Sequence, residues 1–101
     1  MTQNVIRIGV DELFEAKGSW WCHLVCDDFT PEGLEVLHSF ASQLGISPRA
    51  FHDPPGHPRP HYDLPPEHRT LALLQGAESL TRRELVEFLR RGREALARTE
   101  S

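Results

Sequence analysis

Trp20–Cys26 reads WWCHLVC, a nearly continuous apolar segment in a chain of 101 residues. A run of this length and composition predicts a strand that is covered on both faces. Successive side chains of a strand point to opposite faces, so Cys22 and Cys26 share one face and His23 points to the other. The segment therefore predicts a central strand with an imidazole inside a buried sheet.

The segments on either side of this strand show strand-like and helix-like patterns in turn. Val5–Val10, VIRIGV, is rich in β-branched residues and predicts a first strand. Asp11–Gly18 predicts a short connection with one helical turn. Residues 31–44 carry apolar residues at helical spacing between an N-cap at Thr30 and a left-handed C-terminal residue at Gly45, and predict a helix.

The second half of the chain continues this alternation. Ser47–Phe51 predicts a short turn, and His61–Leu64 predicts a short strand or extended segment. The segment from Pro65 to Gln75 predicts a helix that Gly76 ends. Ala77–Leu80 is the right length for a further short strand.

The last helix begins at a capping box, in which Thr81 is followed three residues later by Glu84. Alternating strands and helices predict one α/β domain over residues 1–97, with a short, mainly parallel sheet, packed helices and a polar tail at 98–101. Ligands of parallel sheets bind beyond the carboxyl ends of the strands. Asp11 and Asp27-Asp28 follow the first two predicted strands, so we expect these carboxylates at the functional edge.

Composition excludes several classes of protein. The content of 39% hydrophobic and 26% charged residues is that of an ordinary globular domain, and a net charge of −4 gives no broad field for nucleic acid. The arginines within 82–93 alternate with glutamates, which is typical of a solvated helix face. No phosphate-binding glycine loop or His-Glu-x-x-His motif is present.

Location follows from the same composition. Residues 1–7 lack the features of a signal peptide, and no apolar run approaches the ~20 residues that span a bilayer, so we expect a cytoplasmic protein without membrane contact. Reduced thiols are then expected at Cys22 and Cys26. Three residues separate them and no second pair exists, which disfavours a zinc knuckle and favours small buried hydrophobes.

Phe51–Asp63, FHDPPGHPRPHYD, holds three of the six histidines and two aspartates around four prolines. Because proline fixes φ and lacks an N–H donor, the segment predicts a stiff irregular loop. His61 and Asp63 project to the same side of an extended chain, as a metal pair or a base with its orienting partner requires. Alternatively, Asp63 caps the following helix and His61 only bonds to it. His52 and His57 are expected at the loop surface.

Outside this loop, two histidines and two arginines are further candidates for a functional role. His38 falls within the apolar stripe of its helix and is either a core histidine with one hydrogen bond or an acid/base group. His23 must pair with an aspartate or a carbonyl, for a structural or a functional reason. Arg69 and Arg83 can bind a phosphate or form surface ion pairs.

The chain resembles a small bacterial and phage family that is known only as a domain of unknown function. The resemblance covers about Val5 to Leu89 and rests on Trp-x-His-Leu at 21–24, Leu-His-x-Phe-Ala at 37–41 and His-Tyr-Asp at 61–63. Cys22 stands where the family usually has serine or threonine, and the loop before His61 is richer in proline. The resemblance implies one shared motif, consisting of His23, Asp27, His38, His61 and Asp63.

The leading hypothesis is a metal-dependent hydrolase that acts on a phosphoester in a nucleotide or nucleic acid. His23, Asp27, His61 and Asp63 would bind a divalent metal ion, because mixed imidazole and carboxylate ligands suit a transition metal. Acid/base chemistry would fall to His38, and Arg69 or Arg83 would stabilise charge on the phosphate. The alternative is a non-catalytic binding or adaptor module with a structural His/Asp network. A third hypothesis is a structural metal without catalysis.

Overall fold

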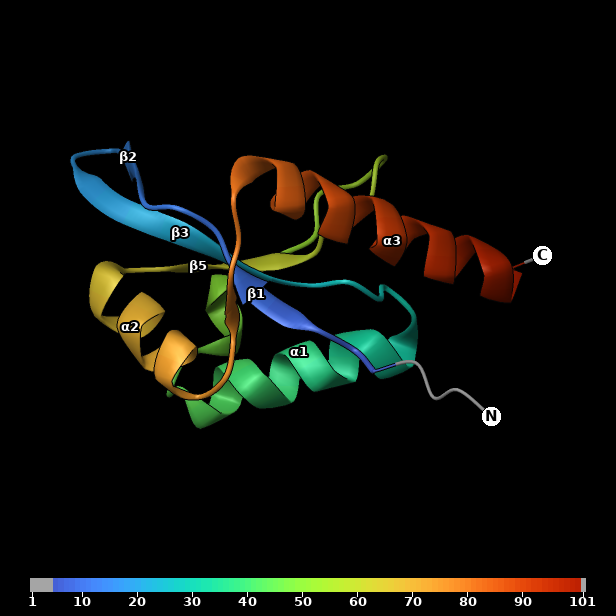
Figure 1. The fold of residues 1–101 in the computed structure, drawn as a ribbon, viewed down its shortest axis with the longest axis horizontal. Helices are drawn as coiled ribbons and strands as arrows, with labels where there is room; N and C mark the ends of the chain where they lie inside the picture. Colours follow the sequence, from blue (N-terminus) through green and yellow to red (C-terminus); the bar gives the residue numbers. More distant parts are fainter. Residues whose placement is uncertain (1–4, 101) are drawn as a thin grey trace.

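The computed structural model describes residues 5–100, so Met1–Asn4 and Ser101, at the ends of the predicted domain and tail, lie outside the described residues. Figure 1 shows a sheet with α3 on one side and α1 and α2 on the other. The strands are β1 (Ile8–Val10), β2 (Phe14–Ala16), β3 (Ser19–Cys26), β4 (Phe51–His52), β5 (His61–Leu64) and β6 (Glu78–Ser79). The helices are α1 (Pro31–Gln43), α2 (Pro66–Leu74) and α3 (Arg82–Glu100), and η1 (Pro48–Ala50) is a 3-10 turn.

The sheet is mixed and mostly antiparallel. Its strand order is β4-β5-β3-β1-β6, and β2 pairs with the first part of β3. Only β1 and β6 are parallel among the described pairs. The α/β class is confirmed, but the prediction of a mainly parallel sheet was wrong. Parallel neighbours need a crossover connection, whereas the chain here passes from β1 through β2 into β3 by a tight turn.

This tight turn replaces the helical turn that was predicted within Asp11–Gly18. Lys17 and Gly18 both have positive φ, 52° and 76°. Two such residues form the type I′ turn that matches the twist of a two-residue hairpin. Phe14 therefore pairs with Trp21 in an antiparallel hairpin.

A β-bulge separates β1 from β2. Val10 is opposite Leu24, whereas Phe14 is opposite Trp21, so four steps on one strand correspond to three on β3. The extra residue bends the strand immediately after β1. Asp11 lies in this bend and donates its N–H to the carbonyl of His23 at 3.3 Å.

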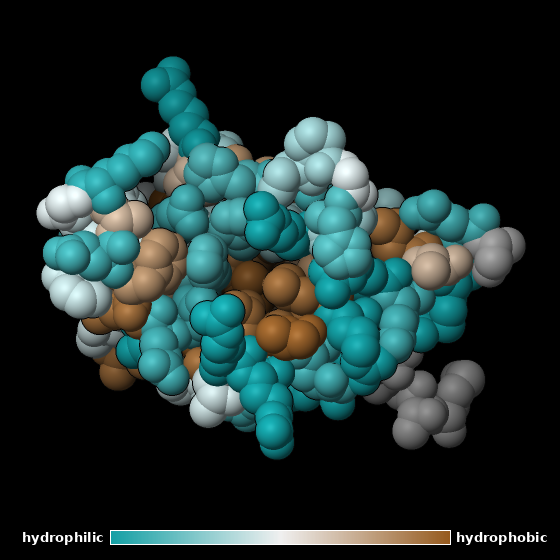
Figure 2. All heavy atoms as spheres, turned by 90° about the horizontal axis from the view of Figure 1, so that it is seen from above, coloured by the Kyte–Doolittle hydropathy of each residue, from teal (hydrophilic) through white to brown (hydrophobic). Residues whose placement is uncertain are grey.

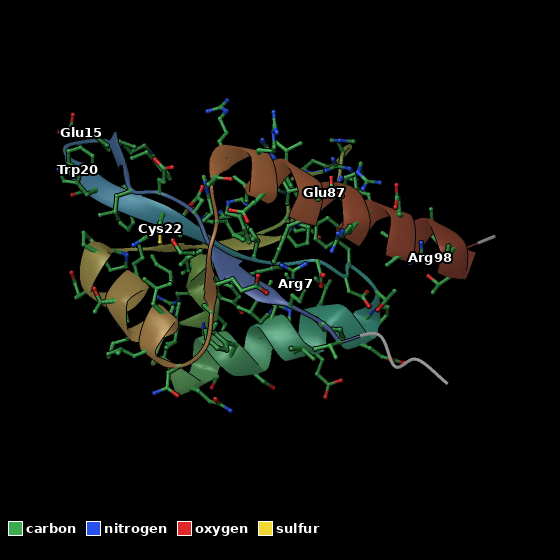
Figure 3. All side chains as sticks on the ribbon, in the orientation of Figure 1. Arg7, Glu15, Trp20, Cys22, Glu87 and Arg98 are labelled. Atoms are coloured by element: carbon green, nitrogen blue, oxygen red, sulfur yellow. The ribbon has the colours of Figure 1, made fainter. Side chains whose placement is uncertain are left out.

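The alternation of side chains along β3 divides the interior into two parts. Cys22, Leu24 and Cys26 are fully buried on the face covered by α1 and α2, as predicted for these cysteines, and Figure 3 shows Cys22 on that side of β3. Val25 packs on the other face with Leu80 and Phe88, under α3. The odd-numbered residues of β3 therefore face α3.

The predicted helix boundaries are confirmed where capping residues define them. Thr30 Oγ1 accepts the N–H of Gly33 at 3.2 Å, and Pro31 is the first residue of α1. Thr81 and Glu84 bond each other's N–H groups at 2.8 and 3.2 Å. α3 continues through Glu100, so the segment 98–100 of the predicted tail is helical. None of the helices within residues 5–100 has the length and apolar character needed to cross a bilayer.

Candidate metal centre

Two histidines and one carboxylate meet on the sheet face that α3 covers. The register of β3 and β5 sets His23 opposite Asp63, and His61 projects to the same face as Asp63. Oδ1 of Asp63 lies 3.6 Å from Nε2 of His61 and 4.0 Å from Nε2 of His23. One ligand atom from each side chain lies within 4.8 Å of the other two. We call these residues the His23–His61–Asp63 cluster.

These separations suit a divalent transition metal. Bonds of about 2.0–2.1 Å in a tetrahedral site hold the ligand atoms roughly 3.3 Å apart. Both distances to Oδ1 of Asp63 exceed this by less than about 1 Å, which small side-chain rotations can supply. Three protein ligands leave a coordination position for water or substrate, as in catalytic rather than structural sites.

The second nitrogen of each histidine is already bonded, which orients both rings. Nδ1 of His23 lies 2.8 Å from Oδ2 of Asp11, and Nδ1 of His61 lies 2.7 Å from the carbonyl oxygen of Arg59. A carbonyl oxygen only accepts, so Nδ1 of His61 is the donor. Nε2 of His61 then keeps its lone pair for a metal. The carboxylate of Asp11 favours the same tautomer for His23.

The bulge after β1 positions Asp11 for this contact. Its Oδ1 accepts the backbone N–H of His23 at 2.6 Å, and its carbonyl oxygen accepts a hydrogen bond from Nε of Arg69 at 2.8 Å. The residue is only 8% exposed. Asp11 was expected at the sheet edge but not among the metal ligands or catalytic residues. Its position directly after a predicted strand was the signal in the sequence that pointed to a functional role. That its partner is His23 follows only from the pairing of β1 with β3.

β4 contributes a third imidazole beside the cluster. Nε2 of His52 lies 3.2 Å from Oδ2 of Asp63, and its ring stacks on that of His61 at 5.5 Å between centroids. Oδ1 of Asp63 thus lies near His23 and His61, and Oδ2 lies near His52. His52 was expected at the loop surface, and this contact was not predicted. The alternative in which Asp63 caps the next helix was wrong, because α2 has no side-chain cap.

The surroundings shift the pKa values of the two cluster histidines in opposite directions. The hydrogen bond that the His23 ring donates to Asp11 raises the pKa of His23, against the lowering effect of burial. Burial lowers the pKa of His61, and the neutral imidazole that it favours is the form that binds metals. His23 also stacks on Phe14 of the hairpin, 4.8 Å between ring centroids, so β2 covers one side of the site.

A cavity of about 240 Å³ adjoins the cluster between the sheet and α3. It is lined by His23, Val25, Arg59, His61, Leu85 and Leu89. Figure 2 looks down on the side of the molecule that carries α3 and shows hydrophobic side chains within a hydrophilic rim. Arg59 comes from the proline loop, whose carbonyl at Pro58 accepts a hydrogen bond from Arg93 of α3 at 3.2 Å. The arginine beside the cluster is therefore neither of the two that were predicted.

Two of the five residues in the predicted motif lie elsewhere. Oδ1 of Asp27 accepts the N–H of Arg7 at 2.8 Å, roughly 13 Å along the strand direction from His23. Figure 3 shows Arg7 away from the hairpin end that carries Trp20. Nδ1 of His38 lies 2.6 Å from the hydroxyl oxygen of Tyr62. Tyr62 points to the opposite sheet face from its neighbours His61 and Asp63. The structure therefore brings together His23, His61 and Asp63 of the motif, and places neither the predicted ligand Asp27 nor His38 with them.

The two predicted phosphate-binding arginines also lie outside the cavity. Nε of Arg69 donates a hydrogen bond to the carbonyl oxygen of Asp11 in the bulge, and its Nη2 lies 3.4 Å from Oγ of Ser79. Arg83 is exposed in the first turn of α3. It precedes Leu85 by two residues, about 200° around the helix, so it points away from the cavity that Leu85 lines.

Comparison with known proteins assigns the chain to a family. No curated protein and no solved structure matches it. Residues 8–92 match a family described as "Protein of unknown function (DUF4031)", and this range includes the whole His23–His61–Asp63 cluster, together with Asp11 and Arg59. Because the match extends over most of the sequence, the chain belongs to the DUF4031 family.

Proposed function

We propose that this protein is a metal-dependent hydrolase that acts on a phosphoester. The observation on which the proposal depends is the convergence of His23, His61 and Asp63, whose metal-binding atoms lie within 4.8 Å of one another. The hydrogen bonds at Nδ1 of His23 and His61 support the proposal. They orient both rings and leave Nε2 of each ring available to bind a metal. A divalent transition metal is the proposed cofactor.

The chemistry would use the open position of this metal. A bound divalent ion lowers the pKa of a water molecule and polarises a phosphoryl oxygen. The water oxygen bonds to phosphorus, the ester P–O bond breaks, and a proton reaches the leaving oxygen, so the products are an alcohol and a phosphate. Arg59 would stabilise the charge on the phosphate in place of Arg69 and Arg83.

Metal content and turnover test the proposal together. Protein purified without a histidine tag and titrated with Zn²⁺ or Mn²⁺ should bind close to one ion per chain. His61→Ala and Asp63→Ala should each weaken metal binding by at least about 100-fold and remove hydrolysis of aryl phosphate and phosphodiester substrates. His57→Ala is the matched control, because His57 is an exposed histidine of the same loop and should retain both properties.

The proposal fails if neither metal ion binds, or if the His61→Ala and Asp63→Ala variants keep wild-type metal affinity and turnover. Metal binding without turnover of any phosphoester would instead support a structural metal. In that case chelation should lower the melting temperature of the wild type and leave that of Asp63→Ala unchanged.

A second candidate function is a binding module with a structural His/Asp network. The observation in its favour is that Asp63 and Asp11 already bond to His52 and His23, at 3.2 and 2.8 Å, within the described residues. This reading predicts that Asp63→Ala lowers thermal stability and that the wild type binds no metal.

The proposed location is the cytoplasm. Cys22 and Cys26 are free and buried, which suits a compartment that keeps thiols reduced. The proposed partner is accordingly a phosphate-containing ligand of the cell interior rather than a component of a membrane.

A further inference from the structure

We propose that the cavity beside the cluster binds the organic group of a small phosphomonoester, with an apolar group about the size of one ring. The inference rests on the proposed hydrolase function, because it names the substrate class for the same site. It comes from the composition and the size of the cavity.

The cavity has an apolar wall and a polar wall. Val25 of β3 and Leu85 and Leu89 of α3 form the apolar wall, and Val25 is 1% exposed. The polar wall consists of His23, His61 and Arg59. A ligand that matches both walls carries a negative group at one end and a hydrocarbon group at the other.

The size of the cavity limits the hydrocarbon group. An apolar cavity of about 150 Å³ holds benzene, and sites for drug-sized ligands typically have about 300–1,000 Å³. The cavity of about 240 Å³ lies between these values. It therefore suits one ring or a short alkyl chain together with part of a phosphate, and it is too small to enclose a nucleotide.

The charges orient the ligand. Asp63 lies beside Nε2 of both histidines and Asp11 beside Nδ1 of His23, whereas Arg59 lines the cavity and is the cation among its lining residues. A phosphate held by Arg59 beside the cluster would leave its ester group directed at Leu85 and Leu89. Selectivity would then come from the α3 wall, since the phosphate contacts are common to all phosphomonoesters.

The test compares two phosphonates that are not hydrolysed. Zn²⁺-loaded protein should bind phenylphosphonate at least about tenfold more tightly than methylphosphonate in calorimetric titrations, because the ring adds buried apolar area. Leu85→Trp fills the cavity and should reduce this ratio to about one, with methylphosphonate affinity retained. Val86→Trp is the control, because Val86 is the next residue of α3 and 57% exposed, and it should keep the ratio.

Equal binding of both phosphonates to the wild type overturns the inference, and so does an unchanged ratio in folded Leu85→Trp. If Leu85→Trp does not fold, Leu85→Ala decides: the enlarged cavity should shift the preference toward 1-naphthylphosphonate, and an unchanged preference overturns the inference. The ratio is independent of turnover. A preference for phenylphosphonate without hydrolysis therefore supports this pocket and refutes the hydrolase function. Hydrolysis without the preference supports the hydrolase function and refutes this pocket.

Discussion

The carboxylate of Asp11 holds His23 at two points, with Oδ2 2.8 Å from the ring Nδ1 and Oδ1 2.6 Å from the backbone nitrogen of the same residue. One side chain thus orients both the imidazole and the strand that carries it. The bulge between β1 and β2 makes this contact possible, and Arg69 supports the backbone of the bulge. Asp11 is a positioning residue in the proposed site.

Replacement of Asp11 should therefore weaken metal binding without removing a ligand. Asp11→Asn is expected to reduce metal affinity by about 10–100-fold, because the amide cannot accept from both nitrogens of His23. Isothermal titration measures the affinity, and the ¹⁵N shifts of the His23 ring report its tautomer. Glu12→Gln removes the same charge from the adjacent, exposed residue and should have no effect. An Asp11→Asn variant with wild-type affinity and ring shifts contradicts the positioning role.

The contact between His38 and Tyr62 should contribute to stability and not to the metal centre. Tyr62→Phe is expected to lower the free energy of unfolding by about 1 kcal/mol, because it removes the 2.6 Å hydrogen bond between α1 and β5. Urea denaturation measures the loss. Metal affinity should be unchanged, since Tyr62 points to the opposite face of the sheet, and a tenfold loss of affinity would contradict that separation.

The two cysteines should not react in the folded protein. Burial raises the pKa of Cys22 and of Cys26 to about 12, so at pH 8 both thiols stay protonated. A thiol reagent such as DTNB should label neither residue in the native protein and both in urea, where the thiol pKa returns to about 8.5. Rapid labelling of the native protein would show that the face under α1 and α2 opens readily.

The same pKa values predict a loss of stability at alkaline pH. The folded-state values lie above the unfolded value of about 8.5, so the unfolded state loses its thiol protons first and stability falls as the pH rises from about 8.5 toward 12. Between pH 8 and 9.5 each cysteine should remove up to about 1 kcal/mol. Urea midpoints at the two pH values measure the fall. The Cys22→Ala/Cys26→Ala variant should show a smaller fall, and an equal fall would assign the effect to other groups.

Gly92 should resist a change that normally stabilises a helix. A Cβ at this position of α3 would lie 2.4 Å from the ring of Phe29. Gly92→Ala is therefore expected to lower the free energy of unfolding by about 1–3 kcal/mol, although alanine is favoured over glycine in helices by about 1 kcal/mol. Thermal denaturation shows whether Gly92→Ala lowers or raises the stability. At the exposed Ala97 the reverse change, Ala97→Gly, should follow helix propensity and also destabilise. A more stable Gly92→Ala would mean that Phe29 moves aside.

Local sequence was sufficient for the features that depend on neighbouring residues. The apolar run at Trp20–Cys26 predicted the central strand, and Thr30 with Pro31 predicted the start of α1. The alternation of an extended chain placed His61 and Asp63 on one face. Each of these features depends on backbone preferences and on contacts within a few residues, so the sequence alone determined them.

The tertiary structure decided how these local units meet. The register of β3 against β5 sets His23 beside Asp63, and the bulge brings Asp11 to His23. The choice of antiparallel partners also separates Asp27 and His38 from the cluster. Short strands can pair with several neighbours in several registers, and a shift of one residue exchanges the two faces. Burial of the two sheet faces under α3 and under α1 with α2 selects one of these arrangements, and this long-range choice creates the candidate site.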